Sequence, residues 1–388
     1  MLLQSIIFGT IYILIFAGYY TITGFLNIVY PNNGFWSFVS FYIMTAIGSL
    51  VVPYFMSKIN FRILFFLSGF SFIIFVGLSS SEIFPLLIVG SVIGGLGNSF
   101  IWIIQGSWIS HHKLSMGLFY SLFNINMLIG NLLSVIVLVT GASIQIMMFS
   151  MIGLVTLGVL LIFFVKPIPP VDTKMGIIHR TKDVFLSIKK CYLLVLCIIY
   201  SSIGLNVTYQ ILPKLLFLSS ENDQTKAIFN SVMYIIYGLT AIFSSLIWSK
   251  LFEINWKYLV IPCTILEIIC LISMLIISKY TTVVYYWLII GFLRGIIDYG
   301  INNLINITLT KFPSEDIDNL FGLYRFIYAF SYLITAICVG YIPYEYILLI
   351  CGLFSVLSAI SYFLFSYYSV DSSEKTLEKQ FDQSEIKL

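Results

Sequence analysis

Twelve stretches of about 20 predominantly apolar residues follow one another along the chain, and they limit its fold more than any other feature. A helix of about this length crosses a bilayer, whereas the strands of a membrane barrel are shorter and alternate in polarity. Only 10% of the 388 residues are charged, against roughly a quarter in soluble proteins. This excludes soluble enzymes and nucleic-acid-binding proteins, which need a polar or basic exterior. We therefore predict an all-α, polytopic membrane protein with spans at 3–29, 35–57, 61–78, 83–107, 115–139, 144–165, 189–212, 226–249, 257–277, 283–310, 320–341 and 344–368.

Most of the predicted connections are only a few residues long, which is too short for a separate folded domain. Two segments are longer and polar: one, rich in proline and basic residues, lies between the sixth and seventh spans, and the other ends the chain. We therefore divide the chain into an N-terminal six-helix half (1–165), a basic linker (166–188), a C-terminal six-helix half (189–368) and a polar tail (369–388).

Basic residues in the loops are distributed unevenly between the two sides of the membrane. Cytoplasmic loops of membrane proteins carry an excess of Lys and Arg. The opposite loops hold only Lys214, Lys226 and Lys279. Both termini are therefore predicted to be cytoplasmic, although the sequence does not indicate which membrane. The side of the termini holds Lys58, Arg62, Lys113, Lys166, Lys174, Arg180, Lys182, Lys189, Lys190, Lys250, Lys257, Lys311, Lys375, Lys379 and Lys387.

A short repeat supports the division into two halves. Ile59-Asn60-Phe61-Arg62 follows the second span, and Ile254-Asn255-Trp256-Lys257 follows the eighth, 195 residues later (254 against 59). Each match is short, but both occupy the same place in their half. Two parallel six-helix halves are the plan of the major facilitator transporters.

Polar side chains recur on one face of several spans, most densely on spans one, four, seven and ten. Polar groups within a bilayer are costly and normally face the bundle interior or a water-filled cavity. In the facilitator plan these four spans surround the central cavity. The aromatic and amide side chains suit an organic solute. We predict a substrate cavity lined by Tyr20, Asn27, Asn98, Trp102, Gln105, Tyr120, Asn124, Asn131, Asn206, Tyr209 and Asn302.

For each amide the alternative is a structural hydrogen bond between helices. The glycines of span four favour a close-packing seam over a ligand loop. His111 and His112 have no nearby Asp, Glu or Cys to complete a metal site. The six cysteines show neither disulfide nor zinc spacing. We predict no metal and no cofactor.

Four charged residues lie within predicted spans. Arg294 and Asp298 are one helical turn apart, a spacing that lets them pair. A carboxylate in mid-membrane must be paired, hydrated or protonated, so Asp298 is either a proton-coupling site or part of a static bridge. Arg325 is predicted to take part in coupling or gating, with a side chain that extends to the membrane surface as the alternative. Glu267 is expected to be a neutral structural residue.

Spans four and five contain a distinctive series of motifs. A glycine-rich stretch precedes Trp102-x-x-Gln105-Gly106, and Gly130-Asn131 closes the pattern. This series resembles the signature of the uncoordinated-ninety-three-like branch of the major facilitator superfamily. Further matches are Leu50-x-x-Pro53 with Ser68-Gly69, Gly295-x-x-Asp298-x-x-x-Asn302, Ser314-Glu315-Asp316 and Phe321-x-x-Tyr324-Arg325-Phe326. The resemblance implies a twelve-helix facilitator fold. It also implies a family that includes orphan transporters, regulatory subunits of potassium channels and trafficking partners of innate immune receptors.

The functional prediction has two forms. The first is a transporter of a small solute that works by alternating access, with proton coupling at Arg294 and Asp298 as one option. The second is a non-transporting regulatory subunit or chaperone of another membrane protein, such as a channel or receptor. The general facilitator signature between spans two and three lacks its usual Asp here, which favours the second form. An enzyme is not expected, because no nucleophile, base and orienting group recur on one face. The expected partners are therefore the bilayer, a solute and a membrane protein, without nucleic acid.

Overall fold

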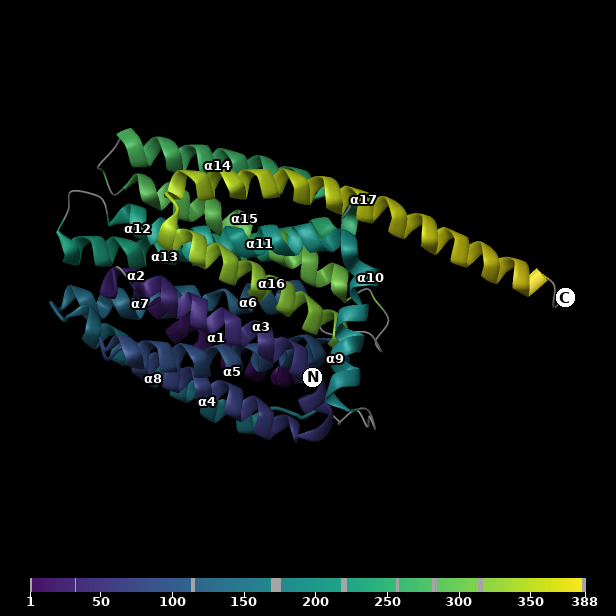
Figure 1. Ribbon diagram of the computed structural model, residues 1–388, viewed down its shortest axis with the longest axis horizontal. Helices are drawn as coiled ribbons and strands as arrows, with labels where there is room; N and C mark the ends of the chain where they lie inside the picture. The colour runs from purple at the N-terminus through teal and green to yellow at the C-terminus, as the bar shows by residue number, and fades with distance from the viewer. Residues whose placement is uncertain are drawn as a thin grey trace.

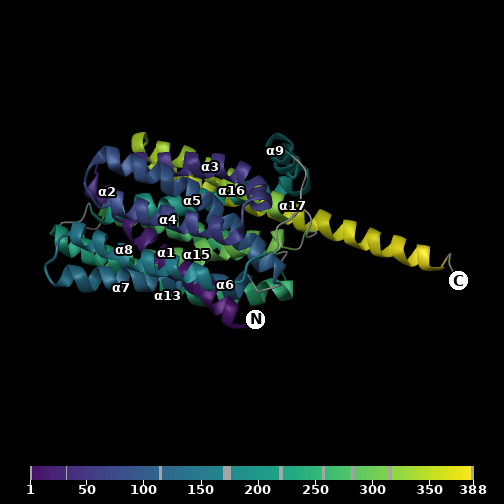
Figure 2. The ribbon, with the colours of Figure 1, turned by 90° about the horizontal axis from the view of Figure 1, so that it is seen from below.

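The computed structural model is a bundle of long helices that run alongside one another (Figures 1 and 2). It describes residues 2–31, 33–112, 116–168, 176–217, 222–255, 258–280, 283, 285–310, 312 and 317–385. Within these residues, 12 helices are long and apolar enough to cross a membrane. The predicted all-α, twelve-span fold is confirmed.

The helices follow the predicted spans closely. The first six spans are α1 (Leu2–Thr23) with α2 (Leu26–Val29), α3 (Gly34–Lys58), α4 (Phe61–Ser79), α5 (Phe84–His111), α6 (Met116–Phe123) with α7 (Ile125–Val139), and α8 (Ile144–Leu161) with η1 (Ile162–Phe164). The connecting segment contains α9 (Ile177–Leu186), α10 (Ile188–Cys191) and η2 (Tyr192–Leu194). The last six are α11 (Val195–Asn206) with the π-helical turn η3 (Val207–Ile211) and α12 (Leu212–Leu216), α13 (Asp223–Asn255), α14 (Val260–Tyr280), α15 (Tyr286–Leu309), α16 (Ile317–Tyr341) and α17 (Tyr344–Glu385).

Some of the sequence predictions fall outside the described residues. These are the proline-rich part of the linker (169–175), the motif Ser314-Glu315-Asp316, and the second copy of the short repeat beyond Asn255. Among the basic loop residues, the same holds for Lys113, Lys174, Lys257, Lys311 and Lys387.

The linker and the tail both contain helix. Helix α9 lies at the end of the bundle that holds the termini (Figure 1), where it packs on α3 and α16. Val184 is buried there, and the Thr181 hydroxyl donates to the Leu50 carbonyl oxygen at 3.4 Å. The predicted tail continues α17 well beyond the bundle. Both chain ends therefore lie at one end of the bundle, as an even number of spans requires, and the cytoplasmic assignment of that end stays a prediction.

The glycines of α5 bring that helix close to its neighbours. A Cβ atom on Gly97 would lie 1.6 Å from the Ser71 hydroxyl oxygen of α4, and one on Gly95 would lie 2.0 Å from the Phe41 carbonyl oxygen of α3. No larger side chain fits at either position. The prediction of a close-packing seam in span four is confirmed. All six cysteines are free, and five of them are buried.

Candidate functional site

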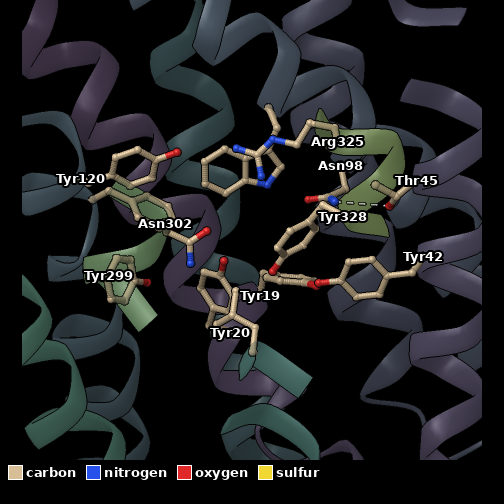
Figure 3. Close-up of a pocket in the computed structure, with 13 residues that line it drawn as sticks. Tyr19, Tyr20, Tyr42, Thr45, Asn98, Tyr120, Tyr299, Asn302, Arg325 and Tyr328 are labelled. Carbon is tan, nitrogen blue, oxygen red and sulfur yellow. Dashed lines mark hydrogen bonds between the residues drawn. The ribbon is translucent and has the colours of Figure 1, made fainter. Parts of the chain in front are cut away.

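A small cavity of about 40 Å³ lies where helices of the first six spans meet helices of the last six. At roughly 10–15 Å³ for each water, it has room for about three water molecules. Polar and aromatic side chains converge on it from both sides (Figure 3). Its walls come from α1, α3, α5 and α6 on one side and from α11, α15 and α16 on the other. They are formed by Tyr19, Tyr20, Tyr42, Thr45, Asn98, Trp102, Tyr120, Phe123, Leu205, Tyr299, Asn302, Arg325 and Tyr328.

Helix contacts close the bundle on either side of this cavity. At the end away from the termini, Asn230 of α13 donates to the Gly24 carbonyl oxygen at 3.2 Å, and the Ser134 and Ser231 hydroxyls are 2.8 Å apart. At the end with the termini, a Cβ atom on Gly106 of α5 would lie 2.9 Å from the Phe321 ring of α16. Helices of the first six spans therefore contact helices of the last six at both ends of the bundle.

The structure brings together five of the eleven residues predicted to form a substrate cavity. Tyr20, Asn98, Trp102, Tyr120 and Asn302 all line it. The helices that carry these residues converge on the cavity, as the polar faces of the spans suggested. Arg325, which was grouped with coupling or gating, lines the same cavity.

Three of the predicted amides bond to backbone or serine groups elsewhere in the bundle. Asn124 donates to the Ala241 carbonyl oxygen at 3.1 Å and to the Ser245 hydroxyl at 2.8 Å, both on α13. Asn206 donates to the Tyr332 carbonyl oxygen of α16 at 3.2 Å. Asn131 donates within its own helix to Met127. The structural alternative, a hydrogen bond between helices, applies to Asn124 and Asn206, whereas the bond of Asn131 stays within α7.

The other three predicted cavity residues also lie outside its lining. Asn27 is in α2, where its side-chain oxygen faces Gly34 at the end of the bundle. Gln105 is fully buried in α5, about one turn beyond Trp102. Tyr209 lies behind the wall and stacks on Tyr20 with ring centroids 5.0 Å apart.

Arg294, Asp298 and Glu267 form a buried charged cluster behind the Tyr299 side of the cavity. The predicted pairing of Arg294 with Asp298 is confirmed as an ion pair. Glu267, on α14, also pairs with Arg294: its two carboxylate oxygens accept from Nη1 at 2.7 and 2.8 Å. The expectation that Glu267 is neutral is wrong, because Glu267 forms an ion pair with Arg294. Sequence spacing could not indicate that α14 turns this residue toward α15.

The remaining donors of Arg294 are also used. Its Nε donates to the Thr208 hydroxyl at 2.9 Å, and Nη2 donates to the Gly204 carbonyl oxygen at 2.6 Å as well as to Asp298. Asp298 in turn accepts from Thr208 at 2.7 Å and from the Tyr237 hydroxyl at 3.2 Å. The π-helical turn η3 supplies Thr208, and such irregular turns are frequent at functional sites.

Arg325 has a different environment. Its side chain is 7% exposed, and its guanidinium carbon lies 4.4 Å from the Trp102 ring centroid and 4.7 Å from that of Tyr324. In Figure 3 the Tyr120 hydroxyl points toward this group. The alternative in which Arg325 extends to the membrane surface is wrong, because aromatic faces hold the cation inside the bundle.

Comparison with known proteins identifies the family. The family model described as "MFS_1: Major Facilitator Superfamily" matches residues 1–335. The chain belongs to the major facilitator superfamily. It is thus an integral, multi-pass membrane protein. No curated protein sequence matches this facilitator.

Solved structures share the facilitator fold at low sequence identity. The proton:xylose symporter XylE, bound to 6-bromo-6-deoxy-D-glucose, is 14% identical with a TM-score of 0.65, covering 92% of this chain and 94% of its own. The human organic anion transporter MFSD10 (TETRAN) is 10% identical with a TM-score of 0.66, covering 92% of this chain and 98% of its own. At these identities the likeness concerns the fold alone.

Sequence reasoning missed the tyrosines that this facilitator contributes from α3 and α16. Tyr42 stacks on Tyr332 with ring centroids 3.7 Å apart, and Tyr328 lines the cavity one turn after Tyr324. The signal was present as tyrosines four residues apart at 324, 328 and 332. The predicted cavity residues came from spans one, four, five, seven and ten, whereas these tyrosines lie on spans two and eleven. The other lining residues outside the prediction are Tyr19, Thr45, Phe123, Leu205 and Tyr299.

Proposed function

We propose that this facilitator carries a small solute across the membrane by alternating access at its central cavity. The observation that carries the proposal is the composition of the cavity wall: residues of the first six spans and of the last six face one another across it. In this proposal the two six-helix halves (1–165 and 189–368) rock against each other. The linker at 166–188 joins them on the side of the termini, and the tail at 369–388 takes no part.

The size of the cavity supports a mechanism with moving halves. Pockets for organic ligands commonly measure about 300–1,000 Å³, whereas this cavity measures about 40 Å³. A solute larger than a few waters therefore enters only after the helices at one end separate. The contacts of Asn230 with Gly24, and of Gly106 with Phe321, would open in turn.

The charged cluster supports proton coupling as part of the proposal. Asp298 is 3% exposed and precedes Tyr299, which lines the cavity. If the opening of the cavity turns the Arg294 side chain away from Asp298, the Asp298 carboxylate loses its counter-ion inside the membrane and takes up a proton. Proton binding would then be linked to the exposure of the cavity. Arg294 and Asp298 are the coupling residues in this scheme, and Arg325 belongs to the solute site.

The chain's branch within the superfamily and an alternative, non-transporting role are further parts of the proposal. We propose membership of the uncoordinated-ninety-three-like branch on the strength of Trp102-x-x-Gln105-Gly106 and the related motifs. A non-transporting subunit of that branch would keep the cavity closed and bind a membrane-protein partner. The resemblance to that branch and the missing Asp between spans two and three favour this form.

Cysteine accessibility separates the two forms. In a background without reactive native cysteines, Asn98→Cys at the cavity wall should react with a membrane-impermeant maleimide from each side of the membrane in turn. Thr140→Cys in the exposed loop after α7 is the matched control, because it should react from one side only. Metabolite profiles of cells with and without the protein should then identify a solute for uptake assays in liposomes. A cavity cysteine that is unreactive from both sides, together with unchanged metabolites, would overturn the proposal.

A further inference from the structure

Arg325 is a buried cation whose N–H donors are only partly used within the described part of the chain. Its Nε and Nη2 atoms are buried and have no hydrogen-bond acceptor among the described residues. The ion pairs in this part of the chain join Arg294 to Glu267 and Asp298, and Lys226 to Asp223. None of them involves Arg325. A guanidinium has five N–H donors in a planar fork, so Arg325 offers free donors to whatever enters the cavity.

The aromatic neighbours of Arg325 stabilise its charge without occupying these donors. Trp102 and Tyr324 contact the guanidinium carbon at 4.4 and 4.7 Å, measured to the ring centroids. A cation over a ring face interacts with the π electrons of the ring. The N–H donors lie in the plane of the guanidinium, so the ring faces do not serve as their hydrogen-bond acceptors. The rings therefore hold the fork in place, which reduces the loss of side-chain entropy when an acceptor binds.

The charge of the cavity is positive and uncompensated. Among the described residues that line it there is no Asp or Glu. The carboxylates of Glu267 and Asp298 are outside this lining and pair with Arg294, so that cluster keeps one negative charge in excess. A buried charge without a counter-ion is costly. An anion in the cavity removes this cost, whereas a cation increases it.

The rest of the cavity wall fits a flat apolar body better than a sugar-like one. Tyr20, Tyr42, Tyr299 and Tyr328 present rings to the cavity. Each of the two amides of the wall also makes a hydrogen bond within the bundle: Asn98 donates to the Thr45 hydroxyl at 3.3 Å, and Asn302 accepts from Ser201 at 3.0 Å. Apart from Arg325, most other polar groups of the wall are tyrosine hydroxyls, each at the edge of an aromatic ring.

We propose that the central cavity binds an organic monocarboxylate with a planar, apolar body. The carboxylate lies against the free N–H groups of Arg325, where bidentate pairing matches the geometry of the fork. The body stacks among the tyrosines and Trp102. This inference deepens the proposed transport function and rests on it, because it takes the central cavity as the solute site.

Equilibrium binding to the purified full-length protein tests the inference with three probes of one shape. Radiolabelled benzoate should bind saturably and raise the unfolding temperature. Benzamide, its neutral counterpart, should bind at least about tenfold more weakly, since a charge-assisted bond is lost. Benzamidinium should not bind.

R325Q should weaken benzoate binding at least about tenfold, and R325K by less, because it keeps the charge and loses the fork. Arg62→Gln, at the edge of α4, is the matched control and should bind as the wild type does.

A stability measurement separates a binding role from a structural one. Without an organic anion, R325Q should unfold at the same temperature as the wild type or higher, since it removes an unpaired buried charge. A wild type that does not bind benzoate, equal affinity for benzamide, or benzoate affinity of R325Q within about twofold of the wild type would each overturn the inference. So would R325Q unfolding well below the wild type.

The result also distinguishes this inference from the proposed transport. Arg325-dependent benzoate binding without benzoate exchange across liposomes supports the anion site and contradicts transport. Conversely, uptake of a neutral or cationic solute that R325Q leaves unchanged supports transport and overturns the anion site.

Discussion

Arg294 on α15 and Arg325 on α16 are both buried within the last six spans, but their surroundings differ in kind. Arg294 shares its five donors among two carboxylates, one hydroxyl and one carbonyl oxygen. Arg325 is held by ring faces, and its Nε and Nη2 find no acceptor in the described part of the chain. All donors of Arg294 therefore have acceptors within the protein, whereas Arg325 keeps donors for a ligand. Substitution of Arg294 should therefore lower stability, as for a structural residue. Substitution of Arg325 should lower ligand affinity, as for a ligand-binding residue.

The largest effect should follow from Arg294→Gln. This change leaves Glu267 and Asp298 buried without their counter-ion, a situation that costs about 3–5 kcal/mol. We expect the variant to lose most of its folded yield, measured by size-exclusion chromatography and thermal unfolding in detergent.

The control replaces the whole cluster by neutral groups. Arg294→Met combined with Glu267→Gln and Asp298→Asn should recover most of the lost stability, because no unpaired charge remains buried. If the triple variant is as unstable as Arg294→Gln alone, the ion pairs are not what stabilises this region.

A smaller effect on stability is expected from Asp298→Asn. The Asn side chain still accepts from Thr208, and Glu267 still neutralises Arg294, so we expect a loss of about 1–3 kcal/mol, as for a hydrogen bond to a charged group. Uptake of a confirmed solute should lose its dependence on the proton gradient. The matched control is Glu267→Gln, on the side of Arg294 away from the cavity, where Glu267 also accepts from the Cys351 thiol at 3.2 Å. It should lower stability similarly and keep the gradient dependence. Gradient dependence that persists in Asp298→Asn would contradict the coupling role.

The same comparison shows what the sequence predicts well. The twelve spans follow from hydrophobic length, because a bilayer allows hardly any other backbone for such stretches. The pair of Arg294 and Asp298 follows from helical spacing, because both residues lie on one helix. Local physics determines both features, so no knowledge of the neighbouring helices is needed.

Features that depend on helix rotation could not be predicted in this way. Glu267 contacts Arg294 only because α14 presents that face to α15. Asn98 and Asn124 look alike in sequence, yet one lines the cavity and the other bonds to α13. The apolar surroundings do not discriminate between these outcomes, since lipid-facing and buried helix faces are equally apolar.

Trp102→Leu tests whether the Trp102 ring positions the Arg325 guanidinium for ligand binding. Removal of the ring takes away a cation–π contact of about 0.5–2 kcal/mol and frees the guanidinium to change its orientation. We expect benzoate affinity to fall several-fold, measured by equilibrium binding. Trp102→Phe keeps a ring face and should lose less. If both variants bind benzoate as the wild type does, Trp102 does not position the fork.

The smallest effect is expected from Asn124→Ala, which tests whether Asn124 is a structural or a ligand-binding residue. Asn124 was predicted to line the cavity, but its amide donates to Ala241 and Ser245 on α13. Hydrogen bonds between membrane helices contribute about 0.6 kcal/mol on average, so the free energy of unfolding should fall by about this amount, measured by denaturant titration. Benzoate affinity should stay unchanged. Asn98→Ala is the matched control, because its amide faces the cavity and its loss should alter benzoate affinity. A change in affinity without a change in stability for Asn124→Ala would place Asn124 with Arg325 instead of with the helix contacts.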